Sequence, residues 1–167
     1  MGRWSYSDRR TVEECKDITV KFLNEHHFLD GGARWGGMKW TRNGEETGNI
    51  NVVVSTTAGN ENIRFQYTVT DRDSGEKSDF DYKARLDWTP CHFGGRGWWF
   101  ICPLVVRGQA CNRRVGALYL GDGNYFGCRH CHDLTYESSK ECHRFDRLFR
   151  RMGISPKEAK RRFKNGF

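Results

Sequence analysis

Residues 63–88 read IRFQYTVTDRDSGEKSDFDYKARLDW, and apolar side chains alternate with polar ones on both sides of a central turn. A period of two places successive side chains on opposite faces of a β-strand. The apolar faces of the two strands would carry Phe65, Tyr67 and Val69, and Phe80, Tyr82, Ala84, Leu86 and Trp88. Because residues 71–75 are typical turn formers, the run predicts an antiparallel meander, to which residues 49–54 (NINVVV) add a strand.

The residues before this meander predict one or two short helices that end by Gly31-Gly32. Thr11 and Glu14 have the spacing of a capping box, in which two side chains satisfy free N–H groups at a helix start. The apolar residues then recur at approximately helical intervals, at Val12, Cys15, Ile18, Phe22 and Leu23.

Composition limits the class of protein. The chain has 167 residues, 37% of them hydrophobic and 14% aromatic, which suffices for one ordinary domain or two small ones and excludes long disorder. No apolar run approaches the roughly 20 residues of a membrane span. We therefore expect a cytoplasmic protein without a membrane partner.

Four of the seven cysteines follow a pattern typical of a zinc site, Cys102-x8-Cys111-x16-Cys128-x2-Cys131. Residues 113–120 and 125–127 flank the turn-forming residues 121–124, which predicts a β-hairpin between the two cysteine pairs. Four thiolates complete a tetrahedral shell, so we expect a zinc ribbon with one structural Zn²⁺. The first pair is widely spaced, and another residue can replace Cys111 as a ligand: Cys91, His92, His130, His132, Cys142 or His143.

The C-terminal residues predict a basic helical hairpin. Ser138 and Glu141 have capping-box spacing, and the apolar stripe that follows is Cys142, Phe145, Leu148, Phe149 and Met152. Ser155-Pro156 is a good start for a second helix, so the segment resembles a helix-turn-helix. All of the net charge of +7 lies here, because residues 140–167 carry 10 basic and 3 acidic side chains whereas residues 1–139 carry 18 of each.

The expected fold class is therefore α+β. It comprises an N-terminal helical segment (1–36), an antiparallel β meander (37–90), a zinc-ribbon hairpin (91–137) and a basic helical hairpin (138–167).

Several motifs in the second half of the chain resemble a family of small zinc-ribbon proteins found in phages, prophages and integrative elements. The motifs cover about residues 89–138 and are TPCHFGG (89–95), WWFICP (98–103), CNRRV (111–115) with LYL (118–120), and FGCRHC (126–131) with LTYES (134–138). The resemblance implies zinc ligation by Cys102, Cys111, Cys128 and Cys131 and an origin in a phage or other mobile element. It implies no particular function.

The charge asymmetry favours a polyanionic partner, because each phosphate neutralised by Lys or Arg releases condensed counterions. We expect a non-enzymatic nucleic-acid-binding protein, with DNA favoured over RNA. The candidate contacts are Arg96, Arg113, Arg114, Arg129, Arg144, Arg147, Arg150, Arg151, Lys157, Lys160, Arg161, Arg162 and Lys164. The alternative is a protein-binding module that inhibits or adapts a host complex through the aromatic surface of the ribbon.

An enzyme is less favoured than a binding protein. The acids Asp71, Asp73, Asp79 and Asp81 can in principle bind Mg²⁺ or act as acid and base, but their positions are typical of a turn and of the solvent face of a strand.

Overall fold

The computed structural model of the chain describes residues 9–71, 74–92, 94–141, 151 and 153. They fall into two compact units, Cys15–His132 and the described parts of Met1–Glu14 and Asp133–Phe167. Among these residues, no helix has both the length and the apolar character needed to cross a membrane.

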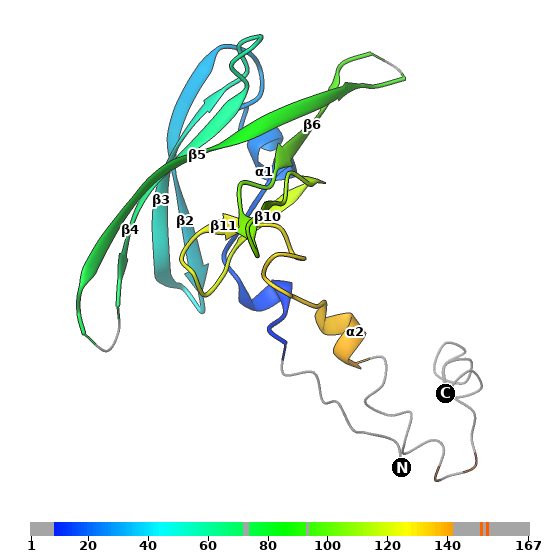
Figure 1. Ribbon diagram of the computed structural model, residues 1–167. Coiled ribbons are helices and arrows are strands. Elements are labelled where there is room, and N and C mark those ends of the chain that lie inside the picture. Colours follow the sequence, from blue (N-terminus) through cyan, green and yellow to red (C-terminus); the bar gives the residue numbers. More distant parts are fainter. Residues whose placement is uncertain (1–8, 72–73, 93, 142–150, 152, 154–167) are drawn as a thin grey trace. The chain divides into compact units, whose positions relative to one another are not determined.

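The larger unit is built on a curled, antiparallel six-stranded sheet with the order β2-β3-β4-β5-β6-β9 (Figure 1). Its strands are β2 (Ala33–Arg42), β3 (Glu45–Ser55), β4 (Asn62–Thr70), β5 (Lys77–Pro90), β6 (Arg96–Ile101) and β9 (Arg114–Val115). The predicted meander is confirmed, because β4 and β5 pair in the register Phe65 with Tyr82 and Tyr67 with Phe80. These aromatic side chains therefore share the face of the sheet that is covered by the core.

β5 is long enough to pair with two neighbouring strands along different parts of its length. Its residues 77–85 pair with β4, and its residues 86–90 pair with β6. The same strand thus continues from the meander into the sheet that leads to the first cysteine.

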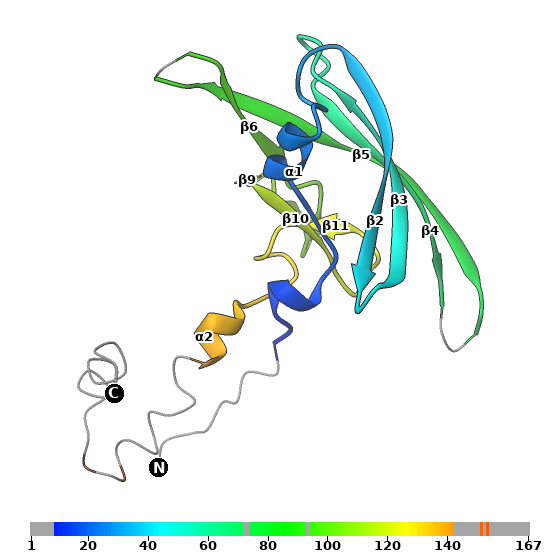
Figure 2. The same cartoon turned by 180° about the vertical axis from the view of Figure 1, so that it is seen from behind.

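A three-stranded layer and a helix cover one face of the six-stranded sheet (Figures 1 and 2). The layer has the order β1-β10-β11, with β1 (Asp17–Thr19), β10 (Ala117–Leu120) and β11 (Phe126–Gly127), and α1 spans Val20–Glu25. Ile18, Leu118 and Phe126 from the layer are fully or almost fully buried in one cluster with Phe65 and Phe100 of the sheet. The core therefore lies between the two sheets.

Two tyrosine hydroxyls of the sheet bind the turn between β10 and β11. The Tyr67 hydroxyl donates to the carbonyl oxygen of Asn124, and the Phe126 N–H donates to the Tyr82 hydroxyl at 2.7 Å. Burial is the main cause that raises the pKa of both phenols, so both stay neutral and keep these bonds at physiological pH.

The N-terminal residues differ from the predicted helices. Val12–Glu14 form a single 3₁₀ turn, Ile18 lies in β1 opposite Leu118, and α1 begins only at Val20. The Thr19 hydroxyl caps α1 by accepting from the Phe22 N–H at 3.0 Å. The apolar stripe looked helical because a strand and a helix in succession bury their side chains against the same core.

The smaller unit joins the N-terminal segment to the residues that follow His132. The Val12 N–H donates to the Thr135 carbonyl at 2.9 Å, and Arg9 forms an ion pair with Asp133 at 3.0 Å. Helix α2 spans Glu137–Glu141.

The expected α+β class is wrong, because the described residues are mostly β with only two short α-helices. The difference arises because β2 to β5 are long strands, and because the predicted N-terminal helices are reduced to a 3₁₀ turn and the six-residue α1. The predicted basic helical hairpin lies outside the described residues, except for residues 138–141, 151 and 153.

Candidate metal centre

Four cysteine side chains come together at one end of the three-stranded layer. The sulfur atoms of Cys102, Cys111, Cys128 and Cys131 all lie within 4.8 Å of one another. The distances are 3.8 Å between Cys102 and Cys131, 3.8 Å between Cys111 and Cys128, and 3.5 Å between Cys128 and Cys131. A tetrahedral ion with Zn–S bonds of about 2.3 Å separates its ligands by about 3.8 Å, so this cluster can hold a metal ion.

The first pair of cysteines is joined by a small β-hairpin. Cys102 follows β6 directly, and the eight residues after it contain β7 (Val105–Val106) and β8 (Gln109–Ala110). The Cys111 N–H donates to the Leu104 carbonyl at 2.9 Å, which closes the hairpin at its base. The long spacing therefore forms an ordered hairpin that returns Cys111 to the side of Cys102.

The second pair lies on a tight turn that follows β11. The Cys131 N–H donates to the Cys128 carbonyl at 3.0 Å, and the Cys128 N–H donates to the sulfur of Cys102 at 3.3 Å. We call the segments 102–111 and 128–131 the first and second knuckle. They are connected by the hydrogen bond from the Cys128 N–H as well as by the contacts between their sulfur atoms.

The protonation of the cluster also suits a cation. The hydrogen bond from the Cys102 thiol is the main cause that lowers the pKa of Cys128, to about 4, which favours the thiolate form of its sulfur. The same hydrogen bond, followed by burial, raises the pKa of Cys102, and burial raises the pKa of Cys131 to about 12. A bound cation would replace the thiol protons and stabilise all four sulfurs as thiolates.

Close packing holds the two knuckles together. A Cβ atom on Gly127 would lie 2.1 Å from Cδ1 of Leu104 and 2.8 Å from Nε2 of His132. A Cβ atom on Gly121 would lie 2.1 Å from Nδ1 of His132. The imidazole therefore fills a slot beside two glycines, where burial is the main cause that lowers its pKa.

None of the alternative ligands that the structure describes joins the cluster. Cys91 is exposed between β5 and β6, and His92, His130 and His132 contribute no ligand atom to the group of four. Cys142 and His143 lie outside the described residues. Cys111, the one ligand for which the sequence left replacements open, has its sulfur 3.8 Å from that of Cys128.

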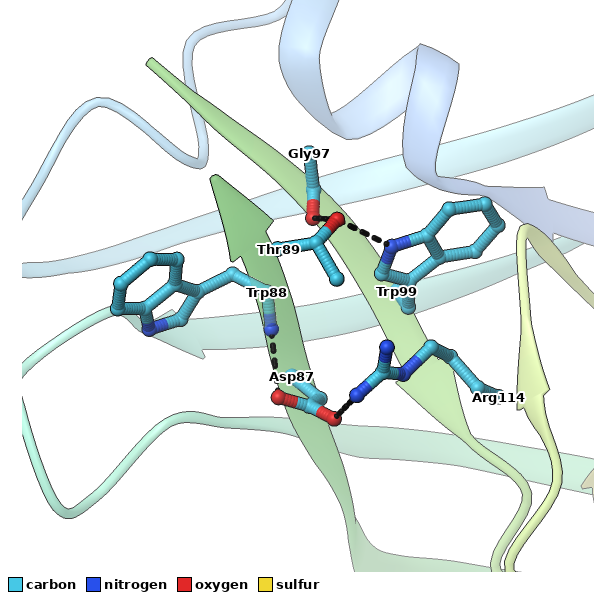
Figure 3. A network of polar contacts seen from close by, with 6 residues as sticks. All are labelled: Asp87, Trp88, Thr89, Gly97, Trp99 and Arg114. Atoms are coloured by element: carbon cyan, nitrogen blue, oxygen red, sulfur yellow. Dashed lines mark hydrogen bonds and ion pairs between the residues drawn. The ribbon is translucent and has the colours of Figure 1, made fainter. Parts of the chain in front are cut away.

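The candidate nucleic-acid contacts of the larger unit are spread over several elements. Arg96 lies over the ring of Trp88, with Cζ 4.4 Å from the ring centroid. Arg114 forms an ion pair with Asp87, as Figure 3 shows. Arg113 is exposed beside the first knuckle, and Arg129 is half-buried in the second. Arg151 is described and exposed, whereas the following lie outside the described residues: Arg144, Arg147, Arg150, Lys157, Lys160, Arg161, Arg162 and Lys164.

The acids of the meander have structural partners. Asp71 accepts from the backbone N–H of Ser74 at 2.8 Å, Asp79 accepts from the Thr68 hydroxyl at 2.6 Å, and Asp81 forms an ion pair with Arg64. Asp73 lies outside the described residues. Within the described residues, these acids join no group that could hold a metal ion.

Sequence reasoning did not predict the packing that supports the cluster, and it considered His132 only as an alternative ligand. Leu104, Gly121, Gly127 and His132 carry no ligand atom in the cluster, yet they set how closely the knuckles approach. The glycine directly before Cys128 is the one signal in the sequence that indicates this packing.

No family model, curated protein or solved structure matches this chain.

Proposed function

We propose that the protein is a non-enzymatic nucleic-acid-binding protein in which the four cysteines hold one structural Zn²⁺ and the basic C-terminal residues contact phosphates. The cluster of four sulfurs within 4.8 Å carries the metal part of this proposal. Tetrahedral sets of four thiolates are typical of zinc or iron–sulfur sites, and a closed shell without a free position suits a structural ion.

The distribution of charge supports the nucleic-acid part. Residues 1–139 are neutral and residues 140–167 carry the whole net charge of +7. Such a segment binds phosphates without needing a pocket, and its affinity falls steeply as salt rises.

The test combines a metal assay with a binding titration on nuclease-treated protein. We expect one zinc per chain and binding to duplex DNA whose logarithmic affinity falls linearly with logarithmic salt concentration. Replacing Lys160, Arg161 and Arg162 with Ala should reduce that slope by about 3, since each phosphate contact on duplex DNA contributes about 0.9.

A matched variant removes three charges from the body of the protein. Lys21, Arg42 and Lys77 are exposed, and their joint replacement with Ala changes the net charge by the same amount. This control should leave the slope nearly unchanged. Equal effects of the two triple variants, or wild-type binding that salt does not weaken, would contradict a role for the basic segment.

A second candidate is a protein-binding module. The β7–β8 hairpin exposes Val105 and Val106, at 64% and 41% of their surface, which favours an apolar contact. This function predicts that the protein co-purifies with a partner in fixed stoichiometry after nuclease treatment, and that Val105→Ser with Val106→Ser abolishes the complex.

A further inference from the structure

The outward face of the ribbon strand β6 carries a tryptophan in a fixed position. Trp98 and Phe100 point into the core with 8% and 0% of their surface exposed, whereas Trp99 between them is 36% exposed. Nε1 of Trp99 donates to the Thr89 hydroxyl at 3.2 Å, and that hydroxyl donates to the Gly97 carbonyl at 3.4 Å (Figure 3). The indole is therefore held in one orientation by β5 while part of it stays open to solvent.

Charged side chains flank this indole on the same face. Trp99 lies opposite Asp87 in the β5–β6 pair, and Arg114 lies opposite Ile101 in the β6–β9 pair. Arg114 forms an ion pair with Asp87, and this contact is the main cause that lowers the pKa of Asp87. Arg85, two residues before Asp87, is exposed on the same face of β5 and donates to the Asn112 side chain at 3.2 Å.

We call the set of Arg85, Asp87, Thr89, Trp99 and Arg114 the Trp99 platform. It has two guanidinium groups and one carboxylate, so it is net positive around an exposed aromatic ring. The carboxylate orients one guanidinium, which lowers the entropy that Arg114 would lose on binding a ligand.

We infer that the Trp99 platform stacks an unpaired base of single-stranded nucleic acid on Trp99, with Arg85 and Arg114 contacting the flanking phosphates. An exposed aromatic ring beside cations is the arrangement that single-strand-binding proteins use, and every base has a face that can stack. A paired base in a duplex is already stacked on its neighbours, so the platform selects single strands. The inference rests on the proposed function, because it names the class of nucleic acid and a second place of contact.

The experiment compares binding of the metal-loaded full chain to a short oligothymidylate and to a duplex of equal length. Trp99→Leu removes the aromatic ring but keeps an apolar side chain, and it should weaken binding to the oligothymidylate by about 5- to 150-fold, the range of base–aromatic stacking. Binding to the duplex should stay unchanged. Trp99→Phe keeps a ring and should retain an intermediate affinity for the oligothymidylate.

Trp35→Leu is the matched control. Trp35 is 84% exposed on β2, which is the edge strand at the other side of the same sheet. It therefore lies away from Arg85 and Arg114, the two arginines of the platform. Its replacement should change neither affinity. Oligothymidylate should also quench tryptophan emission in the wild type and in Trp35→Leu, but much less in Trp99→Phe.

Two results would overturn the inference in distinguishable ways. If the wild type binds the duplex and Trp99→Leu, folded with a wild-type melting curve, keeps its full affinity for oligothymidylate, the platform is wrong and the proposed function stands. If the wild type binds neither probe, the proposed function fails and the platform fails with it.

Discussion

At the scale of single residues, Gly127 determines how closely the two cysteine knuckles approach. Its missing side chain leaves room for Leu104 from the first knuckle and for His132 from the second. The next residue is Cys128, whose N–H donates to the sulfur of Cys102. A side chain at position 127 would therefore act on the metal geometry without touching a ligand atom.

We expect Gly127→Ala to lower the unfolding free energy of the metal-loaded protein by about 1–3 kcal/mol, because the methyl group overpacks a closely filled contact. It should also weaken metal binding, since Leu104 and His132 must move away from residue 127, which directly precedes Cys128. Denaturant unfolding and competition with a metal chelator measure the two effects.

Gly123→Ala provides the control, because a Cβ atom there meets nothing within 4 Å and the backbone is not left-handed. A Gly127→Ala protein that unfolds at the same denaturant concentration as this control would show that the contact between the knuckles is unimportant.

At the scale of elements, the β7–β8 hairpin brings Cys111 back to Cys102 although eight residues separate them. Arg107 and Gly108, its two loop residues, have φ angles of 52° and 78°. Positive φ at both central residues is characteristic of a type I′ turn, whose preferred sequence is Asn-Gly. Arg107 therefore adopts a backbone conformation that arginine disfavours.

Arg107→Asn should stabilise the metal-loaded protein by up to about 1 kcal/mol, because asparagine tolerates the left-handed conformation better. Thermal unfolding monitors the change. Arg107→Gln removes the same charge without that preference, so it should leave the melting temperature almost unaltered. Equal shifts for the Asn and Gln variants would attribute the effect to charge rather than to the turn.

The elements differ in how far the sequence predicts them. β4 and β5 each show several alternations, so their faces follow from the sequence, and Phe65 and Tyr82 lie on the core side as expected. β1 has three residues and β7 has two, and elements of that length cannot show a period. The sequence pattern therefore predicts a helix where β1 forms, and it contains no signal for the β7–β8 hairpin.

The candidate site likewise has a part that the sequence predicts and a part that only the folded structure shows. The cysteine spacing predicted which four sulfurs would meet, because ligand types and turn residues are local features of the sequence. The Trp99 platform depends on the register between β5, β6 and β9, which pairs residues as far apart as Asp87 and Arg114. Only the folded sheet brings these charged residues to the same face as Trp99.

At the scale of the whole molecule, the cluster of four cysteines links elements that are otherwise joined by few strand pairs. β9 contributes two residues to the large sheet and β11 contributes two to the three-stranded layer. β2 to β5, in contrast, pair over long registers that do not involve the cysteines.

Cys128→Ser should therefore abolish metal binding and destabilise the strands next to the cysteines more than the β2–β5 meander, although both share one core. Hydrogen exchange followed by mass spectrometry should show a larger loss of protection over residues 96–131 than over residues 45–70. The physical reason is that metal-binding energy contributes directly to folding, and β9 and β11 have only two paired residues each to replace it.

Cys91→Ser is the matched variant, because Cys91 is an exposed cysteine outside the cluster. It should keep both the metal and the exchange pattern of the wild type. A Cys128→Ser protein with one metal ion per chain and unchanged exchange would contradict the assignment of the cluster.

Because β5 runs from the meander to β6, the segment that holds the cysteines cannot be transferred to another protein on its own. The last five residues of β5 are the pairing partner of β6, and its first nine belong to the meander. An excised ribbon would lose that partner and expose β6 as an open strand edge prone to aggregation. A chimera that transplants this metal site to another protein should therefore carry β5 with it, together with the neighbouring strand that keeps β5 paired.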